Sequence, residues 1–189
     1  MNELMRRRRA LMAARGGESF PLYLYNNGAT SPIIGDWNTT GYRYGADSNF
    51  GQRKGSTALC VYTDNKYSVK GGRTFTGDNP IPARFVGKNL HIKGYWKLKG
   101  DVDGGRTYDA YAIISDSVQN ASATQDVLTS GAFTNSISAV TRVTTDMSVG
   151  ATKPFSFTLP ITKAGYVSLV MYKGYNGLIY AYFQEVWIE

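Results

Sequence analysis

The clearest hydrophobic pattern in the chain is a strict alternation between residues 90 and 99. One side carries apolar side chains and a glycine, namely Leu90, Ile92, Gly94, Trp96 and Leu98. The other side carries His91, Lys93, Tyr95, Lys97 and Lys99. Successive side chains of a β-strand point to opposite faces, so a period of two residues is the pattern of a strand. We therefore predict a strand with one face in the core and one basic face in solvent.

Shorter apolar runs, each bounded by turn residues, predict further strands along the body of the chain. They cover residues 20–25, 58–62, 107–115, 137–145, 154–159, 165–173 and 178–188. Strand 107–115 is expected to form a hairpin with strand 90–99, and the last two strands are expected to form a second hairpin. Eight or more strands with recurring turn signals predict an all-β fold, a jelly-roll-like β-sandwich.

The first 17 residues have a different pattern and predict a short N-terminal helical anchor. Residues 2–14 are mostly good helix formers, and Gly16-Gly17 ends the helix and provides a hinge. A helix of about three turns is marginal alone in water, so we expect it to order only when docked on a partner. The predicted organisation is a docking helix with its hinge at 1–17 and a β-sandwich domain at 18–189.

The charge of the chain is concentrated in this N-terminal segment. The 189 residues include 21 Lys and Arg against 14 Asp and Glu, which gives a formal net charge of +7 and a pI of about 9.4. Residues 1–15 hold five arginines against one glutamate, a net charge of +4, so the body is close to balanced. We assign this segment to docking on a partner. The predicted docking residues are Leu4, Arg6, Arg7, Arg8, Arg9, Leu11 and Met12. Binding of nucleic acid by the arginine run is the alternative that we favour less.

Residue counts exclude several kinds of chemistry. One cysteine excludes an intrachain disulfide and a multi-cysteine zinc site, and one histidine excludes two-histidine metal motifs. His91 is expected on a strand surface without a Gly-x-Ser-x-Gly elbow, and Cys60 is expected to be buried and inert. The four glutamates lie near the chain ends, so no carboxylate pair for glycoside hydrolysis is evident. We expect a protein that is not an enzyme and has no cofactor.

A calcium site remains open in the turn after residue 100. Asp101 and Asp103 resemble the start of a calcium-binding loop, but Arg106 and Ala112 occupy positions where an EF-hand requires Gly and Glu. A different calcium site could use Asp101, Asp103 and Asp109. The alternative is an ordinary turn.

Two aromatic segments have the chemistry of a sugar site. A pyranose has an apolar C–H face and a polar rim, so it suits exposed aromatic rings flanked by hydrogen-bonding side chains. The predicted glycan-binding residues are Trp37, Asn38, Tyr42, Arg43 and Tyr44 in one segment and Tyr172, Tyr175 and Asn176 in the other. The alternative is that these aromatic residues fill the core or an interface with another protein. Tyr180 and Tyr182 alternate toward one face of the last strand, and we expect them to pack.

Four short segments resemble structural proteins of phages and prophages of gut bacteria. The segments are residues 1–12, Leu22-Tyr23-Leu24-Tyr25-Asn26-Asn27-Gly28, Gly35-Asp36-Trp37 and Glu185-Val186-Trp187-Ile188-Glu189. The resemblance implies a tail, baseplate or head-fibre appendage located in the virion, which docks on other virion proteins through residues 1–15 and carries a glycan-binding sandwich. It brings no established functional residues.

The remaining expectations concern partners and location. The chain has no run of 18 apolar residues, and the apolar stretch after Arg9 is too short for a signal peptide. We therefore expect synthesis in the host cytoplasm and no membrane insertion. A homotrimer is compatible with aromatic residues on sheet edges. Two other functions stay open: a glycan-cleaving enzyme of a phage tail and a nucleic-acid-binding head protein.

Overall fold

A computed structural model describes residues 19–40, 50–63, 71–100, 107–118, 133, 135–144, 147–173 and 177–189. The predicted docking helix at 1–17 lies outside these ranges. The described strands are β1 (Leu22–Asn26), β2 (Ala29–Thr30), β3 (Trp37–Thr40), β4 (Phe50–Lys54), β5 (Leu59–Thr63), β6 (Gly71–Gly77), β7 (Asn89–Leu98), β8 (Thr107–Ser115), β9 (Ile137–Thr144), β10 (Thr152–Pro160), β11 (Tyr166–Lys173) and β12 (Ile179–Ile188). A short 3-10 helix, η1 (Ala83–Phe85), lies between β6 and β7.

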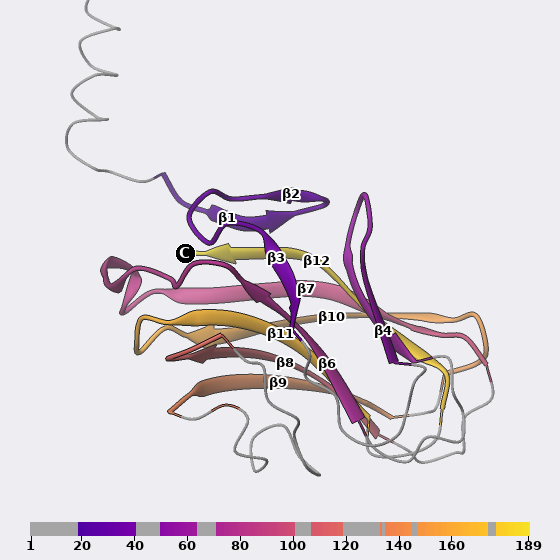
Figure 1. Ribbon diagram of the computed structural model, residues 1–189. Helices are drawn as coiled ribbons and strands as arrows, with labels where there is room; N and C mark the ends of the chain where they lie inside the picture. The colour runs from indigo at the N-terminus through magenta and orange to yellow at the C-terminus, as the bar shows by residue number, and fades with distance from the viewer. Residues whose placement is uncertain are drawn as a thin grey trace, which may run out of the picture.

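The strands form two antiparallel sheets that make a sandwich, which confirms the predicted fold class (Figure 1). The first sheet has the order β10-β7-β12-β1-β2, and β5 pairs with β12 and with β4. The second sheet has the order β3-β6-β11-β8-β9. Strands β5 to β12 therefore lie as β5-β12-β7-β10 over β6-β11-β8-β9, and successive strands change sheet except at β8–β9. This connectivity is that of a jelly roll.

Both predicted hairpins are wrong, although the strands themselves are present. Strand β8 pairs with β11 and β9 in the second sheet, whereas β7 pairs with β10 and β12 in the first. Strands β11 and β12 likewise belong to different sheets. A turn signal shows where the chain reverses, but a chain that crosses from one sheet to the other reverses as sharply as a hairpin.

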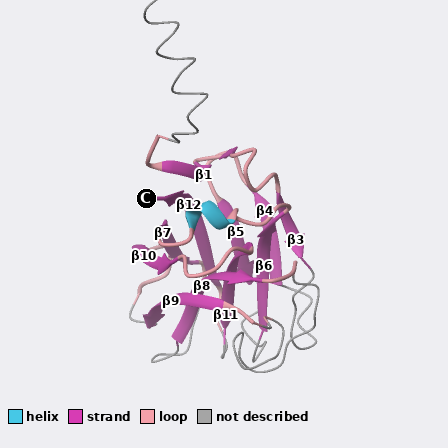
Figure 2. Cartoon of the chain, turned by 90° about the vertical axis from the view of Figure 1, so that its left-hand side faces the viewer, coloured by secondary structure: helices cyan, strands magenta, loops and turns pink. Residues whose placement is uncertain are grey.

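The core between the sheets takes one face of each strand. In β7 the side chains of Leu90, Ile92, Trp96 and Leu98 are buried, and the intervening residues are partly or fully exposed, as the alternation predicted. In the second sheet, β8 is buried along both faces after its first residue. The core is closed at one end by η1, whose Phe85 is 1% exposed; Figure 2 shows η1 in cyan at the end nearest the viewer.

The outer face of the second sheet is covered over part of β8 and β11. Tyr111, Ile113 and Val170 form a second buried cluster with Phe133, which belongs to the long connection between β8 and β9. Arg142 donates to both oxygens of the buried Asp109 at 2.6 and 3.0 Å. The outer face of the first sheet is therefore the better candidate for a ligand.

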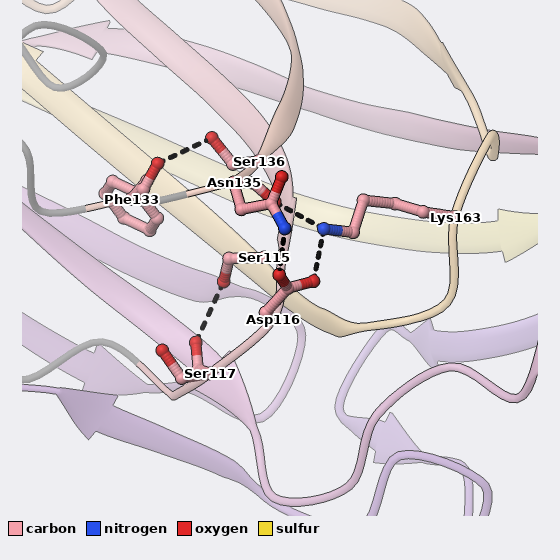
Figure 3. Close-up of polar contacts among 7 residues, drawn as sticks. All are labelled: Ser115, Asp116, Ser117, Phe133, Asn135, Ser136 and Lys163. Atoms are coloured by element: carbon pink, nitrogen blue, oxygen red, sulfur yellow. Dashed lines mark hydrogen bonds and ion pairs between the residues drawn. The ribbon is translucent and has the colours of Figure 1, made fainter.

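A small polar network fixes the described ends of that connection (Figure 3). The Asp116 carboxylate accepts hydrogen bonds from the Lys163 ammonium and from the Asn135 side-chain amide, and Lys163 also donates to the Asn135 carbonyl. Ser136 donates to the Phe133 carbonyl at 2.9 Å, and Ser115 donates to the Ser117 carbonyl at 2.9 Å. The hydrogen bonds from Lys163 and Asn135 hold the pKa of Asp116 below its usual range.

The Asp116 pair should make stability depend on pH. Because its folded-state pKa is lowered, the carboxylate contributes stability above its unfolded pKa, and this contribution is lost as the pH falls through the folded-state pKa. At pH 7 we expect the full chain to have a larger free energy of unfolding than the Asp116→Asn variant. This difference should shrink as the pH falls below about 5. Urea unfolding at a series of pH values measures it. Lys163→Met should remove the larger share of this pH dependence, because the Asn135 hydrogen bond remains, and a difference independent of pH would contradict the role of the carboxylate.

Gly94 should be indispensable to the centre of the first sheet. A Cβ atom there would overlap the Tyr182 carbonyl oxygen and lie 2.7 Å from the Phe155 ring, and a backbone atom cannot move aside as a flexible side chain can. We expect Gly94→Ala to lower the free energy of unfolding by about 3 kcal/mol. The control is Gly87→Ala, whose new methyl group meets nothing within 4 Å and whose cost of about 1 kcal/mol comes from a φ of 93°. Equal losses in urea unfolding would contradict the steric explanation.

Candidate functional site

The first predicted sugar-binding residue, Trp37, is in the core. Its side chain is 0% exposed and meets the buried Tyr25 edge-on, with ring centroids 6.5 Å apart. No face of the indole is therefore available to a sugar, and the prediction for Trp37 is wrong. The neighbouring polar residues of 35–57 gave no information about which way this ring would point.

Asn38 and Tyr172 are not brought together. Asn38 is exposed on β3, where it is in register with Thr76 of β6, whereas Tyr172 on β11 is in register with Gly72, four residues earlier on β6. Tyr172 also packs against the second cluster around Val170. The other predicted glycan-binding residues, Tyr42, Arg43, Tyr44, Tyr175 and Asn176, and all the docking residues lie outside the described part of the chain.

The structure describes only part of the predicted calcium site, and it describes Cys60. Asp101 and Asp103 lie outside the described ranges, and Asp109 is engaged by Arg142. Among the residues that the structure describes, no group of three His, Cys, Asp or Glu side chains is placed to hold a metal ion. Cys60 is buried, as predicted, and forms no disulfide. The helix in the described ranges is too short to cross a membrane.

The outer face of the first sheet carries an aromatic surface that the sequence prediction missed. We call it the aromatic face; it consists of Tyr23, Tyr62, His91, Tyr95, Tyr180, Tyr182 and Trp187. These side chains come from four strands, β1, β5, β7 and β12, and all are at least partly exposed. Backbone pairing between the strands arranges them in two groups.

The first group is a row of three rings across β7, β12 and β1. His91 is in register with Trp187, and Trp187 is in register with Tyr23. The imidazole stacks on the indole with centroids 5.0 Å apart and an interplanar angle of 12°, and Tyr23 lies 6.0 Å from the indole on its other side. Thr158 of β10 ends the row, with its hydroxyl 3.2 Å from Nδ1 of His91.

The second group contains four tyrosines and two cations. Tyr95 stacks on Tyr182 at 4.6 Å and 11°, and Tyr180 lies 4.9 Å from Tyr62 and 6.0 Å from Tyr182. Lys99 lies over Tyr180 at 5.2 Å, and Arg53 lies 5.9 Å from the centre of Tyr62. Arg53 also donates to the Tyr182 hydroxyl at 3.4 Å. Cation–π contacts of this kind stabilise both partners.

The stacking distance determines how these rings stand on the sheet. Neighbouring strands are about 4.8 Å apart, so a stack at 4.6 Å across β7 and β12 requires rings that stand upright on the sheet. One face of Tyr95 is therefore against Tyr182, and its other face looks toward β10. Burial raises the pKa of both tyrosines, so their hydroxyl groups, which are protonated at neutral pH in any case, remain protonated to higher pH than usual.

A hollow lies on the β10 side of Tyr95. Its lining residues are Lys93, Gly94 and Tyr95 from β7, Thr152, Pro154, Phe155 and Ser156 from β10, and Gln184 from β12. Pro154, which also lines the hollow, is in register with Tyr95. The hollow thus combines one open aromatic face with hydroxyl, amide and ammonium groups, which is the chemistry of a small polar ligand with an apolar side.

Two irregularities of the first sheet shape this hollow. Strand β12 has a bulge between Phe183 and Glu185, which places the extra residue Gln184 at the hollow. Opposite the bulge, Gly94 leaves room for the Tyr182 carbonyl and for the Phe155 ring. The hollow therefore depends on Gly94 of β7 and on Gln184, the extra residue of β12 that has no partner on β7.

One ion pair lies between the two groups of rings. Lys93 and Glu185 are in register on β7 and β12, with Nζ 3.4 Å from the carboxylate oxygen. The Lys93 side chain is 54% exposed, so the pair is worth less than about 1 kcal/mol and its ammonium can take another acceptor. Among the described residues that pair in register across β1, β4, β5, β7, β10 and β12, Glu185 is the only one with a carboxylate side chain.

Sequence signals for this site were present but incomplete. The alternation at residues 90–99 correctly placed His91, Lys93 and Tyr95 on a solvent face. Tyr180 and Tyr182 were correctly placed on one face of their strand but were expected only to pack. What no sequence signal showed was that β7 and β12 are neighbours with Tyr95 opposite Tyr182.

No family model and no curated protein matches the chain. Among solved structures, it is similar to a carbohydrate-binding module of family 29, with 9% identity, a TM-score of 0.44 and coverage of 91% of this chain and 90% of that one. A structure titled for promiscuous carbohydrate-binding modules of the β-sandwich superfamily matches with 12% identity and a TM-score of 0.46, over 88% of this chain and 62% of that one. The enzymatically active domain of tailspike protein 4 from bacteriophage CBA120 matches with 15% identity and a TM-score of 0.42, over 88% of this chain but 21% of that one. At such identities the similarity concerns the arrangement of strands.

Proposed function

We propose that this protein binds glycans through the hollow beside Tyr95 and that it is not an enzyme. The observation that supports the proposal is the open face of the Tyr95 ring, which has polar groups on the walls around it. The apolar C–H face of a pyranose stacks on such a ring, and its hydroxyl groups reach the surrounding donors and acceptors. Ser156 and Thr152 of β10 and Gln184 of β12, which line the hollow, supply these groups.

The Tyr95 ring is held in position before any ligand arrives. Its contact with Tyr182, and the hydrogen bond and electrostatic interaction of Arg53 with Tyr182, restrict both rings. An ordered side chain loses less conformational entropy on binding than a mobile one, which costs about 0.5–1.5 kcal/mol to immobilise. The stack therefore supports the tyrosine as a preorganised platform.

A glycan-cleaving enzyme is the second candidate, and the aromatic face argues against it. Hydrolysis of a glycosidic bond generally needs two carboxyl groups, about 5–10 Å apart, on either side of that bond. In the described register rows of this face Glu185 has no such partner, and it already pairs with Lys93. Binding without cleavage is the function that these residues support.

Removal of the Tyr95 ring should abolish glycan binding. On a glycan array, we expect Tyr95→Ala to lose the signal of the full chain, because the stacking surface is gone, whereas Tyr95→Phe keeps the ring and should bind within about threefold of it. Tyr166→Ala is the matched control, because Tyr166 is partly exposed on the second sheet. Thermal unfolding of each variant shows that it is folded. If Tyr95→Ala binds like the full chain, or if products of glycan cleavage appear, the proposal is wrong.

We further propose that the protein is a phage virion appendage attached through residues 1–15. The support is the arginine-rich, helix-forming leader before Gly16-Gly17 together with the resemblance to phage structural proteins. The chemistry of such a leader suits acidic and apolar groups on another virion protein. The sandwich would then face the host surface.

Deletion of residues 1–15 tests this attachment. Every described strand begins at Leu22 or later, so the truncated protein should fold, with an unchanged far-ultraviolet CD spectrum and thermal midpoint. It should also keep glycan binding and be lost from purified particles in an assembly assay. Incorporation of the truncated chain into particles would contradict attachment through this segment, and failure to fold would contradict the modular organisation.

A further inference from the structure

The aromatic face carries an excess of positive charge. Four cationic side chains lie on this face. Arg53 belongs to β4, Lys93 and Lys97 belong to β7, and Lys99 directly follows β7. Among the described residues that pair in register across these strands, only Glu185 has a carboxylate. The surplus of three charges lies along β4 and β7. Of the other described carboxylates, those of Asp36, Asp109 and Asp116 pair with cations elsewhere, and that of Glu189 follows the end of β12, two residues after Trp187.

Two of these cations flank the hollow. Lys93 and Lys97 are two residues before and after Tyr95 on the same face of β7, so each Cα lies about 6.6 Å from that of the tyrosine. Lys93 lines the hollow, and Lys97 is in register with Thr152, which also lines it. A ligand ring stacked on Tyr95 would therefore have an ammonium group at either end.

The contact with Glu185 does not use all the hydrogen-bond donors of the Lys93 ammonium group. A lysine ammonium has three donors, and the distance of 3.4 Å to Glu185 is longer than that of a strong charge-assisted hydrogen bond, about 2.7–2.9 Å. The 54% exposure of the side chain leaves the ammonium open to an anion from solvent. Lys97 has a threonine and a tyrosine, not a carboxylate, as its cross-strand partners.

From this placement we infer that the hollow selects acidic sugars, residues of the uronic or sialic acid class whose carboxylate binds Lys93 or Lys97 while the sugar ring stacks on Tyr95. This inference rests on the proposed glycan binding and names its substrate class. A carboxylate carried on the sugar ring lies at its rim, where the two ammonium groups are. Neutral sugars would satisfy the hydroxyl and amide groups but leave the positive charge uncompensated.

The test compares acidic polymers with their carboxyl-reduced forms. Affinity electrophoresis of the full chain in polygalacturonate, hyaluronate and polysialic acid should show retardation by at least one polymer, and reduction of its carboxylates to alcohols should weaken binding about tenfold or more. Lys93→Met and Lys97→Met should each weaken binding to the acidic polymer by about threefold to tenfold and leave the reduced polymer unaffected. Lys88→Met, which removes one charge near Phe20 outside the aromatic face, should change neither.

The possible results separate this inference from the proposed function. A protein that binds neutral glycans through Tyr95 and ignores all three acidic polymers, or binds the reduced forms equally well, overturns the acidic selectivity and leaves glycan binding intact. A protein that binds no glycan on the array overturns both. Equal retardation by a single-stranded oligonucleotide, lost in the same lysine variants, would assign the charge to phosphate recognition and also overturn the inference.

Discussion

The antiparallel pairing of β7 with β12 determines both faces of the first sheet at once. The same register that sends Ile92 and Trp96 into the core places Tyr95 against Tyr182 and His91 against Trp187 on the outside. Side chains alternate with a period of two, so a slip of one residue would expose the core residues and bury the ring stacks. Packing of the core therefore holds the aromatic face in its arrangement, and no separate device is needed to align the rings.

The two sheets differ in what lies on their outer faces. In the second sheet, Phe133 covers part of β8 and β11, the buried Asp109 pairs with Arg142, and β8 is buried on both sides. In the first sheet, rings with polar edges and long cations keep the outer face partly exposed. Upright tyrosines suit such a surface, because stacking buries their ring faces while their hydroxyl groups remain near water.

The hollow arises where the regular pattern of the first sheet is broken. A bulge adds Gln184 to β12, and Gly94 leaves room for the Tyr182 carbonyl and the Phe155 ring. Bulges of this kind re-aim side chains, and they recur beside functional sites. Here the break lies beside the one tyrosine face that looks toward β10, and two lysines of β7 flank it.

Local patterns in the sequence determined eight of the twelve described strands, the fold class and the solvent side of β7, but they missed β2, β3, β4 and β6. These features follow from side-chain alternation and turn residues within about ten positions, so no distant contact is needed to find them. Pairing between strands was decided by the tertiary structure: both expected hairpins turned out to cross between sheets, and β8 has no alternation because both its faces are buried.

The tertiary structure also decided which single aromatic residues are buried. Trp37 was expected at the surface and Tyr182 in the packing, but the core takes up the first entirely, and the register of β7 with β12 places the second in a partly exposed stack. Burial of a ring depends on what the rest of the chain brings to it, which a segment of sequence cannot specify.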